Sequence, residues 1–257
     1  MPDKQQLAAV DCLGIGVARL GFEAFLAWFD AHTRPGGPAV TLALVNAHTV
    51  NLAYADRGFR EVLNGFSLVL NDGVGLEIYG HLAGRPFLEN FNGTDLFPRV
   101  FAHRTAARDA LRVFLFGARP GVAALAARNI EARYPAVRVV GVRDGYSSGH
   151  DQAELLEAIN DARPHLLLVA LGNPLQEHWI ADHQAQLQVG IACGVGALLD
   201  FLSESIPRAP RWLRRCRLEW LYRLWLEPRR MMKRYVLGNP LFLLRAAGYR
   251  LFGQGGR

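Results

Sequence analysis

Short apolar runs alternate along the chain with longer stretches in which apolar residues recur every three or four positions. The runs are rich in Val, Leu and Ile, which is typical of strands buried on both faces of a parallel sheet. They predict strands at residues 41–45, 68–70, 111–116, 137–142, 166–171 and 189–193. The periodic stretches predict helices, the clearest at residues 22–29, 46–56, 120–134 and 151–162. Strands that alternate with helices of this length indicate an α/β fold, a Rossmann-like, mostly parallel sheet with helices on both faces.

Two segments fall outside this alternation. Residues 9–21 combine short apolar stretches with Gly14, Gly16 and Gly21, and predict a strand or hairpin before the first helix. Residues 81–95 are punctuated by Gly and Pro and predict a loop. With 257 residues, the chain is long enough for one large domain or for one domain with an appendage.

Two predicted strands end in a polar residue that can face a pocket. Asp72 lies in an Asn-Asp-Gly turn after residues 68–70, and Asn46 follows residues 41–45. Ligands of open α/β sheets bind outside the carboxyl ends of the strands, so Asp72 is our candidate general base. The alternative for both residues is the N-cap of the next helix, a position that Asp and Asn favour. Taken alone, the Asp72 turn favours the cap; the other motifs of the chain favour the base.

Glycine follows several of the predicted strands. Each such glycine lets the backbone approach a ligand where a helix N-terminus can hold a phosphate, and together they predict a nucleotide diphosphate site. The glycines concerned are Gly117, Gly172, Gly194 and Gly196. The chain lacks G-x-G-x-x-G, the P-loop, G-x-S-x-G and Asp-x-Asp, which disfavours dehydrogenases, P-loop enzymes, hydrolases of that type and a metal-bound diphosphate. Its three cysteines and eight histidines are scattered, so we expect no metal and no cofactor.

Two further helix starts are predicted from their first residues. Asn92-Gly93-Thr94-Asp95 precedes an apolar helical pattern, and we expect Thr94 or Asp95 to cap that helix, whose free N–H groups can receive an anion. Pro120 is expected at the first position of the next helix.

The charge of the chain is divided unevenly between its two parts. Residues 207–257 hold 13 Lys and Arg against two acids and carry a net charge of +11, so residues 1–206 carry −5 of the overall +6. We therefore expect an acidic catalytic body at 1–206 and a basic, Trp- and Arg-rich appendage at 207–257 that meets an anionic partner. The sequence contains no run of 18 or more apolar residues, so we expect no membrane-spanning helix.

The appendage resembles a helix that lies on a membrane. Trp220, Leu221, Leu224 and Trp225 recur at helical spacing, and the interleaved arginines would each contribute about 1 kcal/mol near an anionic leaflet. These are Arg208, Arg211, Arg214, Arg215, Arg217 and Arg223. The alternatives are a helix packed on the body with solvated arginines, and an arm for single-stranded nucleic acid. The apolar residues 241–244 disfavour nucleic acid. We expect a cytoplasmic protein, peripheral on the inner face of the cytoplasmic membrane, and leave a homo-oligomer open.

Four blocks in this order and spacing resemble the WecG/TagA/CpsF glycosyltransferase family (glycosyltransferase family 26), over about residues 12–244. The blocks are Asn46-Ala47-His48 with Asn71-Asp72-Gly73-Val74-Gly75; Asn92-Gly93-Thr94-Asp95; Gly172-Asn173-Pro174-Leu175-Gln176-Glu177; and Arg208-Ala209-Pro210-Arg211 with Glu219-Trp220-Leu221-Tyr222-Arg223-Leu224. The resemblance implies an inverting, metal-independent transferase whose C-terminal appendage reaches the membrane. Such enzymes move N-acetylmannosamine, its uronic acid or a hexose from a nucleotide diphosphate to a polyprenyl-diphosphate-linked saccharide.

The resemblance also assigns roles to residues. It places the catalytic base on Asp72, pocket amides on Asn46 and Gln176, and nucleotide contacts on Tyr146 and Asp200. Asn90, Gly93, Thr94 and Asp95 are expected near the substrate, and tail arginines over the acceptor diphosphate.

Two departures from the family pattern bear on the substrate. Leu44 stands where the family often has Thr, and Asn90 where it often has Arg, which removes a positive charge near the expected diphosphate. A hexosyltransferase of exopolysaccharide assembly and an enzyme of the teichoic-acid or enterobacterial-antigen type therefore both remain open. The rival from another class is a non-catalytic membrane-surface protein that binds a nucleotide sugar. A two-lobed transferase with paired Rossmann domains is disfavoured by the length of the chain.

Overall fold

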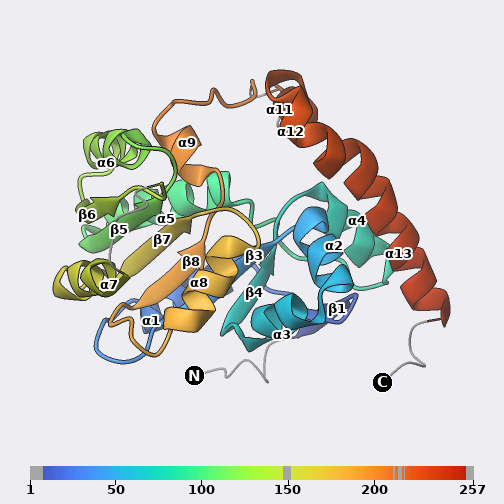
Figure 1. Ribbon diagram of the computed structural model, residues 1–257, viewed down its shortest axis with the longest axis horizontal. Coiled ribbons are helices and arrows are strands. Elements are labelled where there is room, and N and C mark those ends of the chain that lie inside the picture. The colour runs from blue at the N-terminus through green and yellow to red at the C-terminus, as the bar shows by residue number, and fades with distance from the viewer. Residues whose placement is uncertain (1–7, 147–151, 211, 214–215, 217, 253–257) are drawn as a thin grey trace.

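The computed structural model describes residues 8–146, 152–210, 212–213, 216 and 218–252, and it confirms the predicted α/β fold (Figure 1). A six-stranded parallel sheet has the order β4-β3-β8-β7-β5-β6. Its strands are β3 (Val40–Val45), β4 (Leu68–Asn71), β5 (Leu111–Gly117), β6 (Val137–Arg143), β7 (Leu166–Ala170) and β8 (Ile191–Gly194). The predicted hairpin is also present, as β1 (Ala9–Cys12) paired antiparallel with β2 (Ile15–Ala18).

Helices cover both faces of the sheet, because successive strand residues point to opposite sides and each side is apolar. Along β7, Leu167 and Val169 join one core and Leu166 and Leu168 the other. The first core also contains buried residues of α2 (Ala47–Ala55), α3 (Arg57–Gly65), α4 (Val74–Leu82), α7 (Gln152–Asp161) and α8 (Leu175–His183). The second contains residues of α1 (Phe22–His32), α5 (Gly93–Ala107), α6 (Val122–Arg133) and α9 (Leu198–Leu202).

The C-terminal segment forms a run of helices along one side of the molecule (Figure 1). It comprises α11 (Glu219–Leu226), α12 (Pro228–Met231), the π-helix η2 (Met232–Leu237) and α13 (Gly238–Phe252). The predicted break at Pro228 separates α11 from α12. α13 packs on α2 and α4, and its Phe242 is fully buried in the first core. The division of the chain after residue 206 remains a prediction.

Two local expectations were wrong, and one helix was missed. The helix that was expected to begin at Pro120 begins at Val122, after Gly121 in the left-handed conformation. The cap of α5 is Asn92, whose side-chain oxygen accepts from the backbone N–H of Thr94, so neither Thr94 nor Asp95 caps it. The short helix α3 was not predicted. Within the described part of the chain, every helix is too short or too polar to span a bilayer.

Candidate active site

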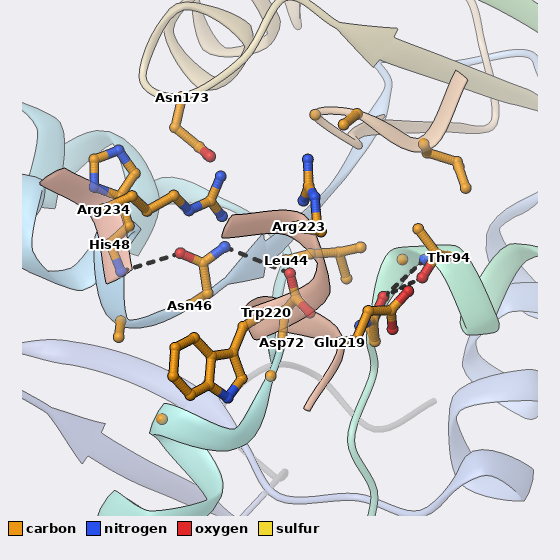
Figure 2. A pocket seen from close by; sticks show the side chains of 18 of the residues that line it. Leu44, Asn46, His48, Asp72, Thr94, Asn173, Glu219, Trp220, Arg223 and Arg234 are labelled. Carbon is orange, nitrogen blue, oxygen red and sulfur yellow. Dashed lines mark hydrogen bonds between the residues drawn. The ribbon is translucent and has the colours of Figure 1, made fainter. Parts of the chain in front are cut away.

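A pocket that is partly open to solvent lies at the carboxyl ends of the central strands (Figure 2). Its floor comes from the turns after β3, β4 and β8 and from the loop after β7, and α11, η2 and the start of α13 cover it. Eight of the predicted site residues line it: Asn46, Asp72, Gly93, Thr94, Gln176, Gly194, Gly196 and Arg223. The sheet order explains why, since β4, β3, β8 and β7 are consecutive neighbours.

Asp72 and Asn46 are held side by side at the ends of two paired strands. The Asn46 Nδ2 group donates to Asp72 Oδ2 at 3.4 Å, and its Oδ1 accepts from the backbone N–H groups of His48 and Thr49 at 3.1 and 3.2 Å. Asn46 is therefore both the cap of α2 and a partner of Asp72. Asp72 caps no helix, because the N-cap of α4 is Gly73 and no side chain bonds there.

The environment of Asp72 raises the pKa of its carboxyl group. Burial is the largest cause, since it penalises the charged form. Arg234, the hydrogen bond from Asn46 and Arg223 oppose this shift by stabilising the carboxylate. A carboxylate whose pKa is raised and which still has a cationic neighbour is a stronger proton acceptor than one in water, which suits a general base.

Two arginines of the C-terminal helices line the pocket. Figure 2 shows the guanidinium groups of Arg223 and Arg234 between Asn173 and the Asn46–Asp72 pair. The Nε atoms of both are buried without a hydrogen-bond partner among the residues that the structure describes. Arg234, after burial, also lowers the pKa of His48, which favours the neutral imidazole. The pocket lining thus combines two carboxylates, those of Asp72 and Glu219, with the guanidinium groups of Arg223 and Arg234.

Arg208 connects the body to the C-terminal helices. Its guanidinium donates to Asp95 Oδ1 at 2.9 Å and to the Thr94 hydroxyl at 3.1 Å. Its Nε lies 3.6 Å from Glu219 Oε1, at the start of α11. Arg208 therefore joins α5 to α11 at the edge of the pocket. The remaining predicted tail arginines, Arg211, Arg214, Arg215 and Arg217, lie outside the described residues.

The two departures from the family pattern have structural roles. Asn90 Oδ1 accepts from the backbone N–H of Gly73 at 2.8 Å and so supports the turn beside Asp72. Asn90 and Asp95 line an adjoining cavity that shares Gly73, Val74, Asn92, Glu219 and Trp220 with the pocket. Leu44 lines the pocket and fills the space opposite Gly93, where an added Cβ would lie 3.1 Å from Leu44 Cδ1.

Gln176 joins the loops that follow β7 and β8. Its Oε1 accepts from the backbone N–H groups of Gly172 at 3.1 Å and Gly196 at 2.9 Å. Gly194 lies directly beside it, since an added Cβ there would lie 2.7 Å from Gln176 Nε2. Gln176 is therefore a support of the pocket floor as well as part of its lining.

Of the residues expected to contact the nucleotide, Gly194 and Gly196 line the pocket, and the other four lie on α9 and at or after the ends of β5, β6 and β7. Gly117 ends β5 with φ +111°, and a Cβ there would lie 2.5 Å from the Ala170 carbonyl oxygen. Tyr146 is 68% exposed and follows β6. On α9, the Oδ1 atom of Asp200 lies 3.9 Å from Nη2 of the exposed Arg119. Gly117, Tyr146, Gly172 and Asp200 do not line the pocket itself.

Sequence reasoning missed several polar residues of the pocket. They include His48, Asn173, Glu219, Trp220, Arg234, Tyr235 and Asn239. His48, Asn173, Glu219 and Trp220 lie in the four sequence blocks, which was the available signal; Arg234, Tyr235 and Asn239 lie beyond them. Among the described residues, no three His, Cys, Asp or Glu gather in a group that could hold a metal ion.

Comparison with known proteins places these residues in a family. The profile described as "Glycosyl transferase WecG/TagA/CpsF family" matches residues 10–255. A Bacillus subtilis (strain 168) N-acetylglucosaminyldiphosphoundecaprenol N-acetyl-beta-D-mannosaminyltransferase is 30% identical over 86% of this chain and 84% of its own. Proteins of the same name from Bacillus spizizenii and Staphylococcus aureus (strain NCTC 8325) are 33% and 26% identical, over 72% and 95% of this chain and 70% and 94% of theirs. The chain belongs to the WecG/TagA/CpsF family of glycosyltransferases.

Proposed function

We propose that this glycosyltransferase moves an N-acetylmannosamine-type sugar from a nucleotide diphosphate to a polyprenyl-diphosphate-linked N-acetylglucosamine, with inversion at the anomeric carbon. The single observation that carries the proposal is the Asp72 carboxylate, held by Asn46 in a pocket that also contains Arg223 and Arg234. The names of the three relatives support this sugar and this acceptor over a hexose donor.

Asp72 acts as the general base in this mechanism. The acceptor hydroxyl attacks the anomeric carbon, its proton passes to the Asp72 carboxylate, and the bond from that carbon to the phosphate oxygen breaks. The nucleotide diphosphate leaves with the electron pair of that bond. Asn46 fixes the carboxylate by its 3.4 Å hydrogen bond, so the base needs no reorientation when the acceptor arrives.

The departing diphosphate needs positive charge, and the guanidinium groups of Arg223 and Arg234 in the pocket lining would supply it. Gly117, Tyr146 and Asp200 would hold the nucleoside end, with Arg119 beside Asp200.

The C-terminal helices are proposed to bind the membrane that carries the polyprenyl acceptor. Their outward side bears exposed large apolar side chains: Leu221, Trp225, Met232, Val236, Leu237, Leu241, Leu243 and Leu244. The same segment is strongly basic, which suits an anionic leaflet. The same helices would then bind the lipid surface and cover the pocket. The active site would therefore be complete at the membrane, where the polyprenyl acceptor is located.

The test is acceptor-dependent release of nucleotide diphosphate by wild type and Asp72→Asn, with panels of UDP- and GDP-sugars and a polyprenyl-diphosphate-N-acetylglucosamine acceptor. We expect release from one donor in the wild type and a loss of roughly 10²–10⁴-fold in the variant, with nucleotide affinity kept, because only the proton acceptor is removed. Asp56→Asn is the matched control, since Asp56 caps α3 away from the pocket and Asn caps equally well.

The alternative is a membrane-surface protein that binds a nucleotide sugar without transferring it. It predicts unchanged nucleotide affinity in Asp72→Asn and no acceptor-dependent release even from the wild type. Release at the wild-type rate by Asp72→Asn would remove Asp72 from the mechanism and leave Glu219 of the pocket and Asp95 of the adjoining cavity as the remaining carboxylates.

A further inference from the structure

A second buried carboxylate, Glu177, lies behind the pocket and has no part in the mechanism above. It is 1% exposed, in the first turn of α8. Its Oε1 accepts from Gln176 Nε2 at 2.7 Å and from Asn173 Nδ2 at 2.5 Å. Its Oε2 is buried without a hydrogen-bond partner among the described residues. Burial of a carboxyl group costs free energy, so we ask what Glu177 does for the two side chains that it contacts.

Gln176 cannot exchange the two ends of its amide. Its Oε1 faces two backbone N–H donors, those of Gly172 and Gly196, and its Nε2 faces Glu177. Reversal would place the amide N–H₂ group against two donors and its oxygen against the carboxylate. The Gln176 amide therefore holds the Glu177 carboxyl group in place, with Oε1 as the acceptor.

Asn173 takes its orientation from the same oxygen of Glu177. The Asn173 Nδ2 group donates to Glu177, so the Oδ1 atom of Asn173 points away from Glu177. Figure 2 shows this Asn173 oxygen pointing into the pocket. Protonation of Glu177 at the unpartnered Oε2 leaves Oε1 an acceptor, so the orientation of Asn173 holds in both protonation states. The facing thiol, Cys193 on β8, stays neutral because burial raises its pKa far above the usual range.

We propose that Glu177 is a positioning residue that fixes Asn173 as a hydrogen-bond acceptor for an O–H or N–H group of the donor sugar. A carbonyl oxygen repels phosphate oxygens, so the sugar rather than the diphosphate is its partner; a hydroxyl or acetamido N–H has the required proton. The inference rests on the proposed function, in that it takes the ligand of this pocket to be a nucleotide sugar.

The experiment is a double-mutant cycle of Glu177→Leu and Asn173→Ala in the full-length protein, read by calorimetric binding of UDP-N-acetylmannosamine and of UDP. Glu177→Leu removes the acceptor and frees the Asn173 amide; Asn173→Ala removes the amide itself. We expect each to weaken binding of the nucleotide sugar about tenfold, the worth of one hydrogen bond, and the double variant no more than either. In all three variants, the affinity for UDP should stay within about twofold of the wild-type value.

Glu177→Gln is the matched control, because it keeps an acceptor oxygen in place and should restore affinity for the nucleotide sugar to within about threefold of wild type. In turnover, the single variants should raise KM for the donor more than they lower kcat. Equal loss of UDP and UDP-sugar binding, or a Glu177→Leu effect that persists undiminished in the Asn173→Ala background, would overturn the proposal and indicate a structural role only.

Two further arms keep the test decisive. If Glu177→Leu does not fold, Asn173→Ala alone decides, since an unchanged ratio of UDP-sugar to UDP affinity contradicts an acceptor facing the sugar. If the wild type binds the nucleotide sugar but releases no diphosphate with acceptor, the proposed function fails while the binding cycle still tests the role of Glu177.

Discussion

At the scale of single residues, two side-chain amides of the pocket each make different hydrogen bonds with their oxygen and their nitrogen. Asn46 caps α2 with its oxygen and holds Asp72 with its nitrogen. Gln176 joins two loops with its oxygen and contacts Glu177 with its nitrogen. An amide used in this way fixes both its neighbours and itself, since reversal breaks bonds at both ends.

Arg234 should influence the pH at which the enzyme becomes active. In the proposed mechanism the reaction needs ionised Asp72, and the charge of Arg234 lowers the pKa that burial has raised. In Arg234→Met that pKa rises further, so the acidic limb of kcat/KM against pH moves to higher pH. The measurement is the pH–rate profile of donor turnover.

Arg229→Met is the matched control for this profile, because Arg229 is an exposed arginine of α12 outside the pocket. A limb at the wild-type position in Arg234→Met would show that Arg234 does not act on the base, even if the maximal rate falls through weaker binding of the diphosphate.

Glu177 should make stability depend on pH. Burial raises its pKa from 4.5 to about 7, so between these values the folded protein keeps a proton that the unfolded chain has lost. The free energy of unfolding that Glu177 contributes is therefore present in full below pH 4.5 and is lost as the pH rises through 7. The stability of wild type relative to Glu177→Gln should fall across this window in urea unfolding.

The same comparison with Glu157→Gln, an exposed carboxylate of α7, should give a much flatter difference. If wild type and Glu177→Gln keep a constant difference between pH 4.5 and 7, Glu177 does not titrate there.

At the scale of elements, Phe242 anchors the C-terminal helices to the body. It is fully buried against Tyr79, with ring centroids 6.0 Å apart, and lies close to Gly75 of α4. Removal of residues 207–257 would uncover this apolar contact along with the pocket, so a point substitution separates the two effects.

Phe242→Ala should lower the free energy of unfolding by about 3 kcal/mol, because it removes a buried aromatic ring from a packed core. It should also reduce turnover, since α13 continues from η2, which carries Arg234. Denaturant unfolding and donor turnover measure the two effects. Leu243→Ala, a neighbour that is 36% exposed, should change stability by less than about 0.5 kcal/mol. Equal losses in both variants would contradict an anchoring role for Phe242.

The elements themselves were largely predictable, and the contacts between distant ones were not. Buried apolar runs and the turns after them identified the six strands of the sheet. α3 was missed because it begins two residues after α2 and contains Gly58 and Gly65, which weaken a helical pattern. The cap of α5 was assigned to Thr94 or Asp95 rather than Asn92, because capping residues occur at all three positions.

The site was predictable where a residue follows a strand directly. Asp72 and Asn46 meet because β3 and β4 pair in parallel, with Val45 opposite Asn71. Arg234 reaches the same pocket from a helix far along the chain, and no local pattern reveals that packing. The orientation of Asn173 likewise depends on Glu177, a contact that only the folded loop creates.

At the scale of the whole molecule, the charge asymmetry and the exposed apolar side chains fall on the same segment. The protein should therefore bind vesicles containing phosphatidylglycerol, and Trp225→Ser with Leu244→Ser should weaken that binding tenfold or more, because each side chain loses apolar area that the bilayer would bury. Salt should weaken it further, since the attraction is partly electrostatic. Co-sedimentation with vesicles measures both effects.

Leu175→Ser is the control for vesicle binding, because Leu175 is 66% exposed but lies on α8, away from the C-terminal helices. If it weakens binding as much as the paired substitution, or if neither does, the C-terminal helices are not the membrane-binding surface.

The position of β8 in the sheet has a consequence for synthesis of the chain on the ribosome. β8 lies between β3 and β7, yet its residues 191–194 come after those of the other five strands. Until they emerge, the nascent chain holds two separate strand groups whose unpaired edges can associate with other chains. The arginines that complete the pocket emerge later still, so a growing polypeptide acquires its sheet first and its catalytic competence last.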